Sequence, residues 1–255
     1  MSTLQTLKTY YANLLRTPYA QIPASAALET LAADVDTART TLAAAVADLG
    51  RRSIQTTAVG NLSYQFFTGA SLKASGLDYL INPAGPNPQN LNSTYYQSFS
   101  IENRFINFAV NLGKNGEGAQ RFAATYGGLS ALDTVTRAYT EIFGTAPTGD
   151  KATTLLNDRV PDGRGGTFTR LEYFATYGLD GVSGVGTKAA LVGWLLAQAA
   201  KEDVGVYAKA EDAFIVDLGP DGLARFDTDL LTSYAPPATP PPAGRDHRFR
   251  PKTSP

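Results

Sequence analysis

The stretch from Ala58 to Leu112 combines aromatic and amide side chains with almost no charge, and this combination limits how the chain can fold. Its aromatic and amide residues are Tyr64, Phe66, Phe67, Tyr79, Tyr95, Tyr96, Phe99, Phe105 and Phe108, with Gln65, Asn92, Gln97, Asn103, Asn107 and Asn111. A plain hydrophobic core favours Leu, Ile and Val over Tyr and Asn. Because buried hydroxyls and amides need hydrogen-bond partners, the fold or a ligand has to supply them. Carbohydrates suit such a surface, since rings pack against the apolar faces of sugars and amides bind their hydroxyls.

Apolar residues recur at helical spacing along most of the chain, which predicts an all-α fold. The predicted helices cover residues 3–15, 25–52, 54–67 and 91–112, with further helices from residue 171 onward. Within the Ala-rich second segment the apolar residues form one stripe, and Gly50 is the predicted stop. The most apolar segment, 191–200, is too short to span a bilayer, so we expect a core helix that includes Trp194.

A weak internal repeat predicts how the helices are arranged. The sequence YQFFTG at 64–69 parallels YTEIFG at 139–144, and residues 10–31 echo the pattern more faintly. Repeated helix–turn–helix units bury a face only against their neighbours, so we expect a multi-helix array of quasi-repeated units. The alternative is that helical proteins reuse such spacing by chance.

The composition changes near the end of the chain. Residues 236–255, PPATPPPAGRDHRFRPKTSP, contain too few apolar side chains to fold alone, which predicts a disordered tail. The preceding residues, 1–235, are predicted to form one helical domain. The repeat suggests that this domain contains sub-units at 1–55, 56–130 and 131–235.

Composition and charge exclude several classes of protein. A formal net charge of −1 gives no electrostatic reason to bind nucleic acid. The chain has no Cys, which excludes thiol catalysis and thiolate metal sites. Its one His, His247, lies in the predicted tail, which excludes a Ser-His-Asp triad and a His-based zinc site. Neither a signal-peptide pattern nor an apolar run long enough for a transmembrane helix is visible.

Several segments occur in the order of one known family: TTAV, YQFFTG, GLDYL and YYQSFSIENRFINFAVNL, followed by GTKAALVGWLLAQAA and IVDLGPDGL. In these segments the chain resembles the N-terminal lipopolysaccharide-anchoring domain of Caulobacter-type surface-layer (S-layer) proteins. The resemblance extends over most of residues 1–236, and ENRFINF is its most specific part. It implies a mainly helical module on the outer cell surface that binds the O-polysaccharide of lipopolysaccharide, in a crystal-like coat assembled with Ca²⁺.

The chain also departs from this family. The glycine-aspartate nonapeptide repeats that follow the anchoring domain in full S-layer proteins are absent, and the sequence instead continues into the Pro-rich tail. The family's C-terminal, type I export route and its lattice formation are therefore not implied for this chain. A short paralogue that occupies anchoring sites without building the lattice fits the same pattern.

For a bound glycan we single out seven residues by side-chain type: Tyr64, Gln65, Tyr95, Tyr96, Asn103, Arg104 and Asn107. On the predicted helix 91–112, Asn103 and Asn107 share one face, one turn apart, just after the two adjacent tyrosines. The prediction is binding without chemistry on the sugar. For each tyrosine the alternative is a core aromatic ring with a satisfied hydroxyl.

Two other functions remain open from the sequence. The module could pair with copies of itself or with an S-layer subunit, so that sugar affinity is incidental. It could also be a polysaccharide-acting enzyme that needs only two carboxylates, for which Glu102 is the best candidate. We favour a simpler interpretation of Glu102, either an ion pair with Arg104 or another neighbour or an acid at a helix N-terminus.

Calcium is the cofactor that the resemblance implies. Ca²⁺ takes six to eight oxygen ligands, and Asp217 and Asp221 lie together in a turn-rich segment. A second acidic cluster contains Asp158 and Asp162. Neither segment matches an EF-hand, and because acidic surface turns are common, the simpler interpretation of each cluster is an ordinary loop. The resemblance favours the first cluster, so Asp217 and Asp221 are the predicted ligands.

Overall fold

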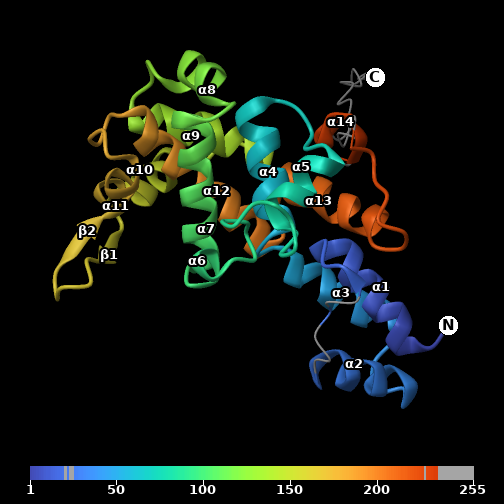
Figure 1. Ribbon diagram of the computed structural model, residues 1–255. Helices are drawn as coiled ribbons and strands as arrows, with labels where there is room; N and C mark the ends of the chain where they lie inside the picture. The colour runs from blue at the N-terminus through green and yellow to red at the C-terminus, as the bar shows by residue number, and fades with distance from the viewer. Residues whose placement is uncertain (20–21, 23–25, 227, 235–255) are drawn as a thin grey trace, which may run out of the picture.

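The computed structural model describes residues 1–19, 22, 26–226 and 228–234 (Figure 1). These residues form fourteen α-helices, one π-helical turn and one two-stranded antiparallel hairpin. The predicted all-α fold is therefore confirmed. The predicted disordered tail, residues 236–255, lies outside the described residues.

Most of the helices are short. They are α1 Thr3–Leu15, α2 Ala26–Asp36, α3 Leu42–Ser53, α4 Thr57–Thr68, α5 Ala74–Ile81, α6 Thr94–Gln97, α7 Ile101–Val110, α8 Ala119–Tyr126, α9 Ala131–Phe143, α10 Gly149–Asn157, α11 Arg170–Gly178, α12 Val185–Glu202, α13 Gly205–Leu218 and α14 Leu230–Tyr234. The π-helical turn η2, Asn111–Asn115, follows α7, and the strands are β1 Arg159–Pro161 and β2 Thr167–Thr169. Among the described helices, none is long and apolar enough to cross a membrane.

The Ala-rich segment predicted as a single helix is two helices, α2 and α3. Between them Ala38 adopts a left-handed conformation with φ 56°, and Thr41 begins α3 by accepting a hydrogen bond from the Ala44 amide at 3.1 Å. The stripe of apolar residues continues across this break, so periodicity alone missed it. Gly50, the predicted stop, lies inside α3, where a Cβ would lie 3.3 Å from Ile215 of α13.

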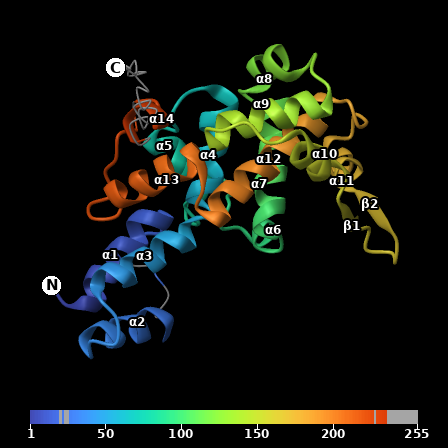
Figure 2. The same ribbon diagram turned by 180° about the vertical axis from the view of Figure 1, so that it is seen from behind.

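Helix α12 is buried on nearly all sides and forms the centre of the larger group of helices (Figures 1 and 2). It packs against α7, α11 and α9. At Gly193 the backbones of α12 and α7 come so close that a Cβ on this glycine would lie 2.6 Å from the Phe105 carbonyl oxygen of α7. The predicted core helix is confirmed, although Trp194 is only partly buried.

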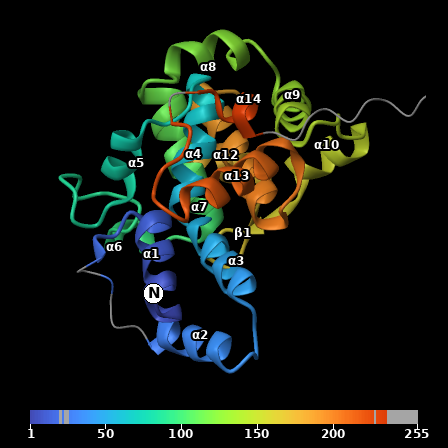
Figure 3. The same cartoon turned by 90° about the vertical axis from the view of Figure 1, so that its right-hand side faces the viewer.

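Helices α1 to α3 form a separate group, seen below the other helices in Figure 3. Both apolar and polar contacts join this group to the rest of the molecule. The Asn13 amide donates to the Gly219 carbonyl at 2.8 Å, and Arg16 pairs with Asp78 at 2.6 Å. Residues 56–130 and 131–235 share one core, because α12 packs against both α7 and α4, and buried residues of the first three helices, such as Leu14 and Leu49, belong to the same core. The division into three sub-units stays a prediction.

The repeated Tyr-x4-Gly pattern marks the C-terminal end of a helix in two places. Helix α4 ends at Gly69 with φ 73°, and α9 ends at Gly144 with φ 77°. Each glycine amide donates to the carbonyl four residues earlier, in both cases at 2.9 Å. Arg16, at φ 51°, ends α1 in the same left-handed conformation. The repeat therefore identifies helix ends that favour glycine because it has no Cβ.

The carboxyl group of Glu211 is buried where α13 contacts α4. The Asn61 amide donates to one carboxyl oxygen at 2.7 Å, and the other oxygen has no partner among the described residues. Burial raises the pKa of Glu211 to about 8, with a smaller lowering by the Asn61 hydrogen bond and a smaller raising by Asp212. The group is therefore mostly neutral in the folded protein at pH 7.

This buried acid predicts a pH-dependent stability. In the unfolded chain the Glu211 carboxyl has a pKa of about 4.3. Between that pH and pH 8 the folded state binds a proton that the unfolded state has lost, so the free energy of unfolding falls as the pH rises. We expect the free energy of unfolding of Glu211→Gln, which keeps an oxygen for Asn61, to rise relative to that of the wild type by about 1.4 kcal/mol per pH unit between pH 5 and 7. Urea unfolding at four pH values measures this difference in the free energy of unfolding, with Glu29→Gln, a substitution of an exposed residue, as the control. Parallel curves for wild type and Glu211→Gln would contradict the buried neutral acid.

Candidate functional site

The predicted helix 91–112 is divided, and this division forms the candidate site. The short helix α6 ends at Gln97, and Ser100 then begins α7 in an extended conformation, with its hydroxyl accepting from the Asn103 amide at 3.3 Å. From this start, Asn103 and Asn107 lie one turn apart, both partly buried, as predicted. Phe105, Ile106 and Phe108 are buried on the other side of the helix.

Tyrosine hydroxyls from two other helices meet these asparagines. Tyr96 of α6 donates to the Asn107 side-chain oxygen at 3.0 Å. Tyr173 of α11 donates to the Asn103 side-chain oxygen at 2.7 Å, and its hydroxyl lies 3.2 Å from that of Tyr177. We call the six residues Tyr95, Tyr96, Asn103, Asn107, Tyr173 and Tyr177 the tyrosine–asparagine cluster.

Tyr95 gives the cluster its exposed ring. The residue is 48% exposed, and its ring meets those of Tyr96 and Phe99 edge-on, at centroid distances of 5.1 and 4.9 Å. Burial is the main cause that raises the pKa of Tyr177, followed by Tyr173, with a smaller contribution from Tyr95. Burial also raises the pKa of Tyr96. The hydroxyls of Tyr96 and Tyr177 therefore stay protonated at neutral pH and can donate hydrogen bonds.

The asparagines keep free hydrogen-bonding capacity. Each uses its side-chain oxygen as an acceptor, and the Asn107 oxygen also accepts from Asn111 at 3.2 Å. The side-chain amide nitrogens of Asn103 and Asn107 donate to no described residue. An exposed aromatic ring beside free amide donors is the combination that a sugar requires.

Three of the predicted glycan residues lie outside this cluster. The Tyr64 hydroxyl donates to Glu117 at 2.5 Å, and this hydrogen bond is the main cause that raises its pKa to about 12. Gln65 is buried, donates to Asp229 at 2.6 Å and accepts from the Leu230 amide at 3.0 Å. Gln65 therefore fastens the 229–230 segment to α4 and offers nothing to a ligand in this conformation.

Arg104 is the third of these residues, and it is buried. Its guanidinium donates to backbone carbonyls of Gln55 at 3.0 Å, Phe99 at 3.4 Å and Leu91 at 3.5 Å. Burial lowers the pKa of Arg104, although three carbonyl dipoles surround the charge. The selection of Arg104 by residue type missed this structural role, because the sequence does not show which carbonyls converge on one side chain.

Sequence reasoning also missed Tyr173 and Tyr177. Both lie on α11, four residues apart, and so share a face of that helix. The start of α11 has a recognisable signal, the capping box of Thr169 and Glu172, in which each side chain binds the other residue's backbone amide. That signal places the helix, but only the packing of α11 against α7 brings the tyrosines to Asn103.

Glu102, the candidate catalytic acid, forms an ion pair with Lys201 of α12. Burial tends to raise the pKa of Glu102, but the hydrogen bond and charge of Lys201 lower it overall. The carboxylate is therefore ionised and paired. The ion-pair interpretation is confirmed, with Lys201 rather than Arg104 as the partner.

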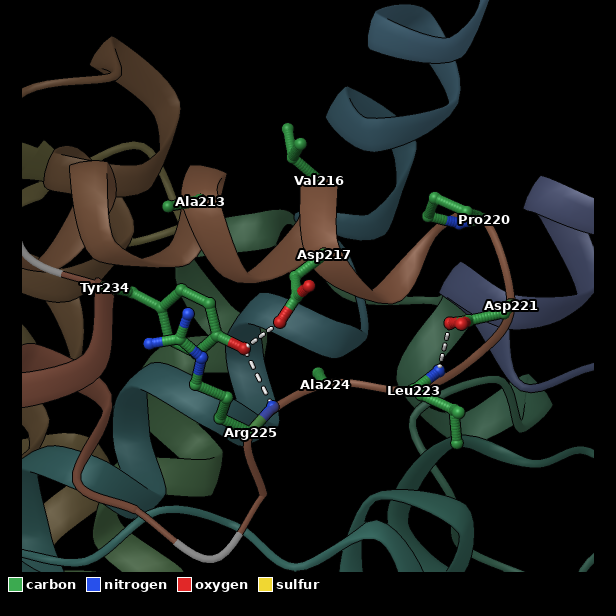
Figure 4. Close-up of a pocket in the computed structure, with 9 residues that line it drawn as sticks. All are labelled: Ala213, Val216, Asp217, Pro220, Asp221, Leu223, Ala224, Arg225 and Tyr234. Atoms are coloured by element: carbon green, nitrogen blue, oxygen red, sulfur yellow. Dashed lines mark hydrogen bonds between the residues drawn. The ribbon is translucent and has the colours of Figure 1, made fainter.

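Asp217 and Asp221 border an open cleft of about 520 Å³ between the end of α13 and α14 (Figure 4). Figure 4 shows Asp217 bound to the Tyr234 hydroxyl, while Asp221 accepts from the Leu223 amide at 2.9 Å. The cleft is also lined by Arg225, whose positive charge opposes a cation. Among the described residues, no group of three or more Asp, Glu or His side chains gathers to hold a metal ion. These two aspartates therefore do not fit a closed calcium site by themselves.

The second acidic cluster belongs to the β1–β2 hairpin. Asp162 accepts from the amides of Arg164 and Gly166, both at 2.8 Å, and so stabilises the turn between the strands. Asp158 pairs with Arg170 at 3.0 Å. Both carboxylates have structural partners, in agreement with the interpretation of this segment as an ordinary loop.

The sequence profile of one known family, described as the RsaA N-terminal domain, matches residues 56–240 of this chain. The match begins just before α4 and covers more than half of the 255 residues. The chain therefore belongs to the RsaA N-terminal domain family, and the predicted resemblance is confirmed. No curated protein matches the chain significantly.

This membership identifies the protein class. The family is a structural S-layer domain and not a known enzyme family, so the chain has an S-layer-related role at the cell surface. The tyrosine–asparagine cluster lies entirely within the matched residues. The first three helices precede the match.

The structural role of Arg104 is testable. In Arg104→Met the carbonyls of Gln55, Phe99 and Leu91 lose their donor, so we expect the free energy of unfolding to fall by about 3 kcal/mol. Urea denaturation measures the loss. Arg52→Met, which removes an exposed ion pair with Asp48, is the matched control and is expected to cost less than about 1 kcal/mol. An unchanged stability of Arg104→Met would return Arg104 to the list of ligand contacts.

Proposed function

We propose that this chain attaches to the bacterial outer surface by binding the O-polysaccharide of lipopolysaccharide at the tyrosine–asparagine cluster. One observation carries the proposal: the exposed ring of Tyr95 packs on Tyr96, whose hydroxyl binds Asn107, and the side-chain amide nitrogens of Asn107 and Asn103 have no partner among the described residues. The ring packs against the apolar face of a pyranose, and the amides donate to its hydroxyls. No bond of the sugar is made or broken.

The hydrogen bonds within the cluster prepare it for a ligand. Tyr96 and Tyr173 hold the two asparagine oxygens, so each amide has one orientation before a sugar arrives. A site whose side chains are already ordered loses less conformational entropy on binding. Family membership supports the same proposal, since an S-layer domain works at the cell surface.

The first prediction of this proposal concerns the ligand. We expect the purified protein to bind smooth lipopolysaccharide and not rough lipopolysaccharide that lacks the O-chain, in a vesicle or bead sedimentation assay. Repeating the assay with Ca²⁺ and with a chelator tests separately whether calcium is required. Equal binding to both preparations, or to neither, would contradict the proposal. Assembly that depends on protein concentration without glycan would then assign the module to self-association.

The second prediction concerns the residues. We expect Tyr95→Ala to weaken binding to smooth lipopolysaccharide about tenfold, which corresponds to about 1.4 kcal/mol, since the variant removes the exposed ring. Tyr79→Ala is the matched control, because Tyr79 is 51% exposed on α5 and lies outside the cluster. Equal effects of the two variants would show that the cluster is not the binding site.

A further inference from the structure

A second cleft lies between α9, α10 and α12, and none of its lining residues belongs to the tyrosine–asparagine cluster. Its volume is about 420 Å³, within the range of about 300–1,000 Å³ typical of small-ligand sites. Tyr139 and Phe143 of α9 form one wall, with their rings stacked at a centroid distance of 4.1 Å. Figure 2 shows the three helices next to one another.

Helix α12 supplies the opposite wall. Trp194, Gln198 and Glu202 follow one another at four-residue intervals, so all three project from one face of the helix into the cleft. Trp194 was predicted to be a core residue, but it is only partly buried and lines the cleft. One face of its indole is covered by the Arg170 guanidinium, 4.5 Å from the ring centroid.

Polar groups in the cleft are left without protein partners. Among the described residues, nothing forms a hydrogen bond or an ion pair with the indole N–H of Trp194, the amide of Gln198 or the carboxylate of Glu202. Lys151 donates to the Tyr139 hydroxyl at 2.6 Å and lies 4.7 Å from the centre of that ring. The cleft therefore presents donors and acceptors together with aromatic surface.

Close backbone contact gives the cleft a fixed end. Gly205, at φ 91°, begins α13 next to the end of α9, and a Cβ there would lie 2.7 Å from the Ile142 carbonyl oxygen. Gly144 is equally close to Val206, with a Cβ position 2.8 Å from its methyl group. The end of α9 and the start of α13 therefore lie in close contact at this end of the cleft.

We propose that this cleft is a second saccharide site, for a pyranose unit with free hydroxyls. Tyr139 and Phe143 offer the aromatic surface, Trp194 and Lys151 donate, Glu202 accepts, and the Gln198 amide does both. A purely apolar ligand would leave these polar groups unpaired, and a single ion would not use the rings. The inference shares its ligand class with the proposed function but concerns different residues, so each can fail separately.

The chain has one tryptophan, which makes the cleft directly observable. The probes are the O-chain polysaccharide released from smooth lipopolysaccharide by mild acid, and glucose, galactose, mannose and N-acetylglucosamine as free sugars. We expect a saturable change in Trp194 emission with the polysaccharide or one of the sugars. Gln198→Ala is expected to weaken the apparent affinity about fivefold, as the loss of a hydrogen bond predicts. Gln120→Ala, an exposed amide on α8, is the matched control.

Combination with the cluster variant separates the two proposals. Tyr95→Ala is expected to leave the Trp194 response intact, and a response lost in that variant would overturn the second site. No change in emission with any of these saccharides would overturn it as well. An emission change that follows protein concentration instead of saccharide would assign the cleft to a second copy of the chain. A Trp194 response without binding to smooth lipopolysaccharide would leave the second site standing and reject the proposed function.

Discussion

The contact between α7 and α12 at Gly193 governs the rest of the structure. No side chain separates the two backbones there, so α7 is pressed against the central helix along its length. This contact sets the position of Asn103 and Asn107, which project from the outer side of α7. It also fixes α11, because α11 packs in turn on α12 and α7 and brings Tyr173 to Asn103. A larger residue at position 193 would displace all three helices and the cluster between them.

The sequence predicted the parts of this fold that depend on local chemistry. Helical periodicity gave the fold class, and the Tyr-x4-Gly repeat located two left-handed helix ends, Gly69 and Gly144. Of the seven residues singled out by side-chain type, Tyr95, Tyr96, Asn103 and Asn107 lie in one cluster. The break between α2 and α3 was missed because alanine rarely adopts the left-handed conformation that Ala38 has here.

The predicted site residues that lie outside the cluster have a different explanation. Gln65 and Arg104 were chosen by residue type, yet both are buried and bind segments distant in the sequence. Tyr173 and Tyr177 were overlooked because their partner on α7 lies about seventy residues earlier. Trp194 was assigned to the core because its neighbours are apolar, whereas the packing of α9 and α10 leaves it partly open. Periodicity identifies a buried face, but only tertiary packing decides which polar side chains remain available.

Most polar groups of the aromatic and amide stretch have partners in the fold, and a few do not. This difference separates side chains that hold the structure together from those that can meet a ligand. The side-chain amide nitrogens of Asn103 and Asn107 belong to the second group, and outside this stretch the indole N–H of Trp194 likewise has no partner among the described residues. Both candidate sites use helices that touch α12, so a rigid central helix supports each of them.

The attachment of the first three helices has a mechanical consequence. Arg16 reaches both Asp78 and the Gly222 carbonyl, and the Thr57 hydroxyl donates to the Leu14 carbonyl beside it. These contacts gather at the end of α1, so a pulling force on the N-terminal helices loads them simultaneously. Such an attachment resists force up to a threshold and then yields in one step, unlike a row of contacts that open in sequence.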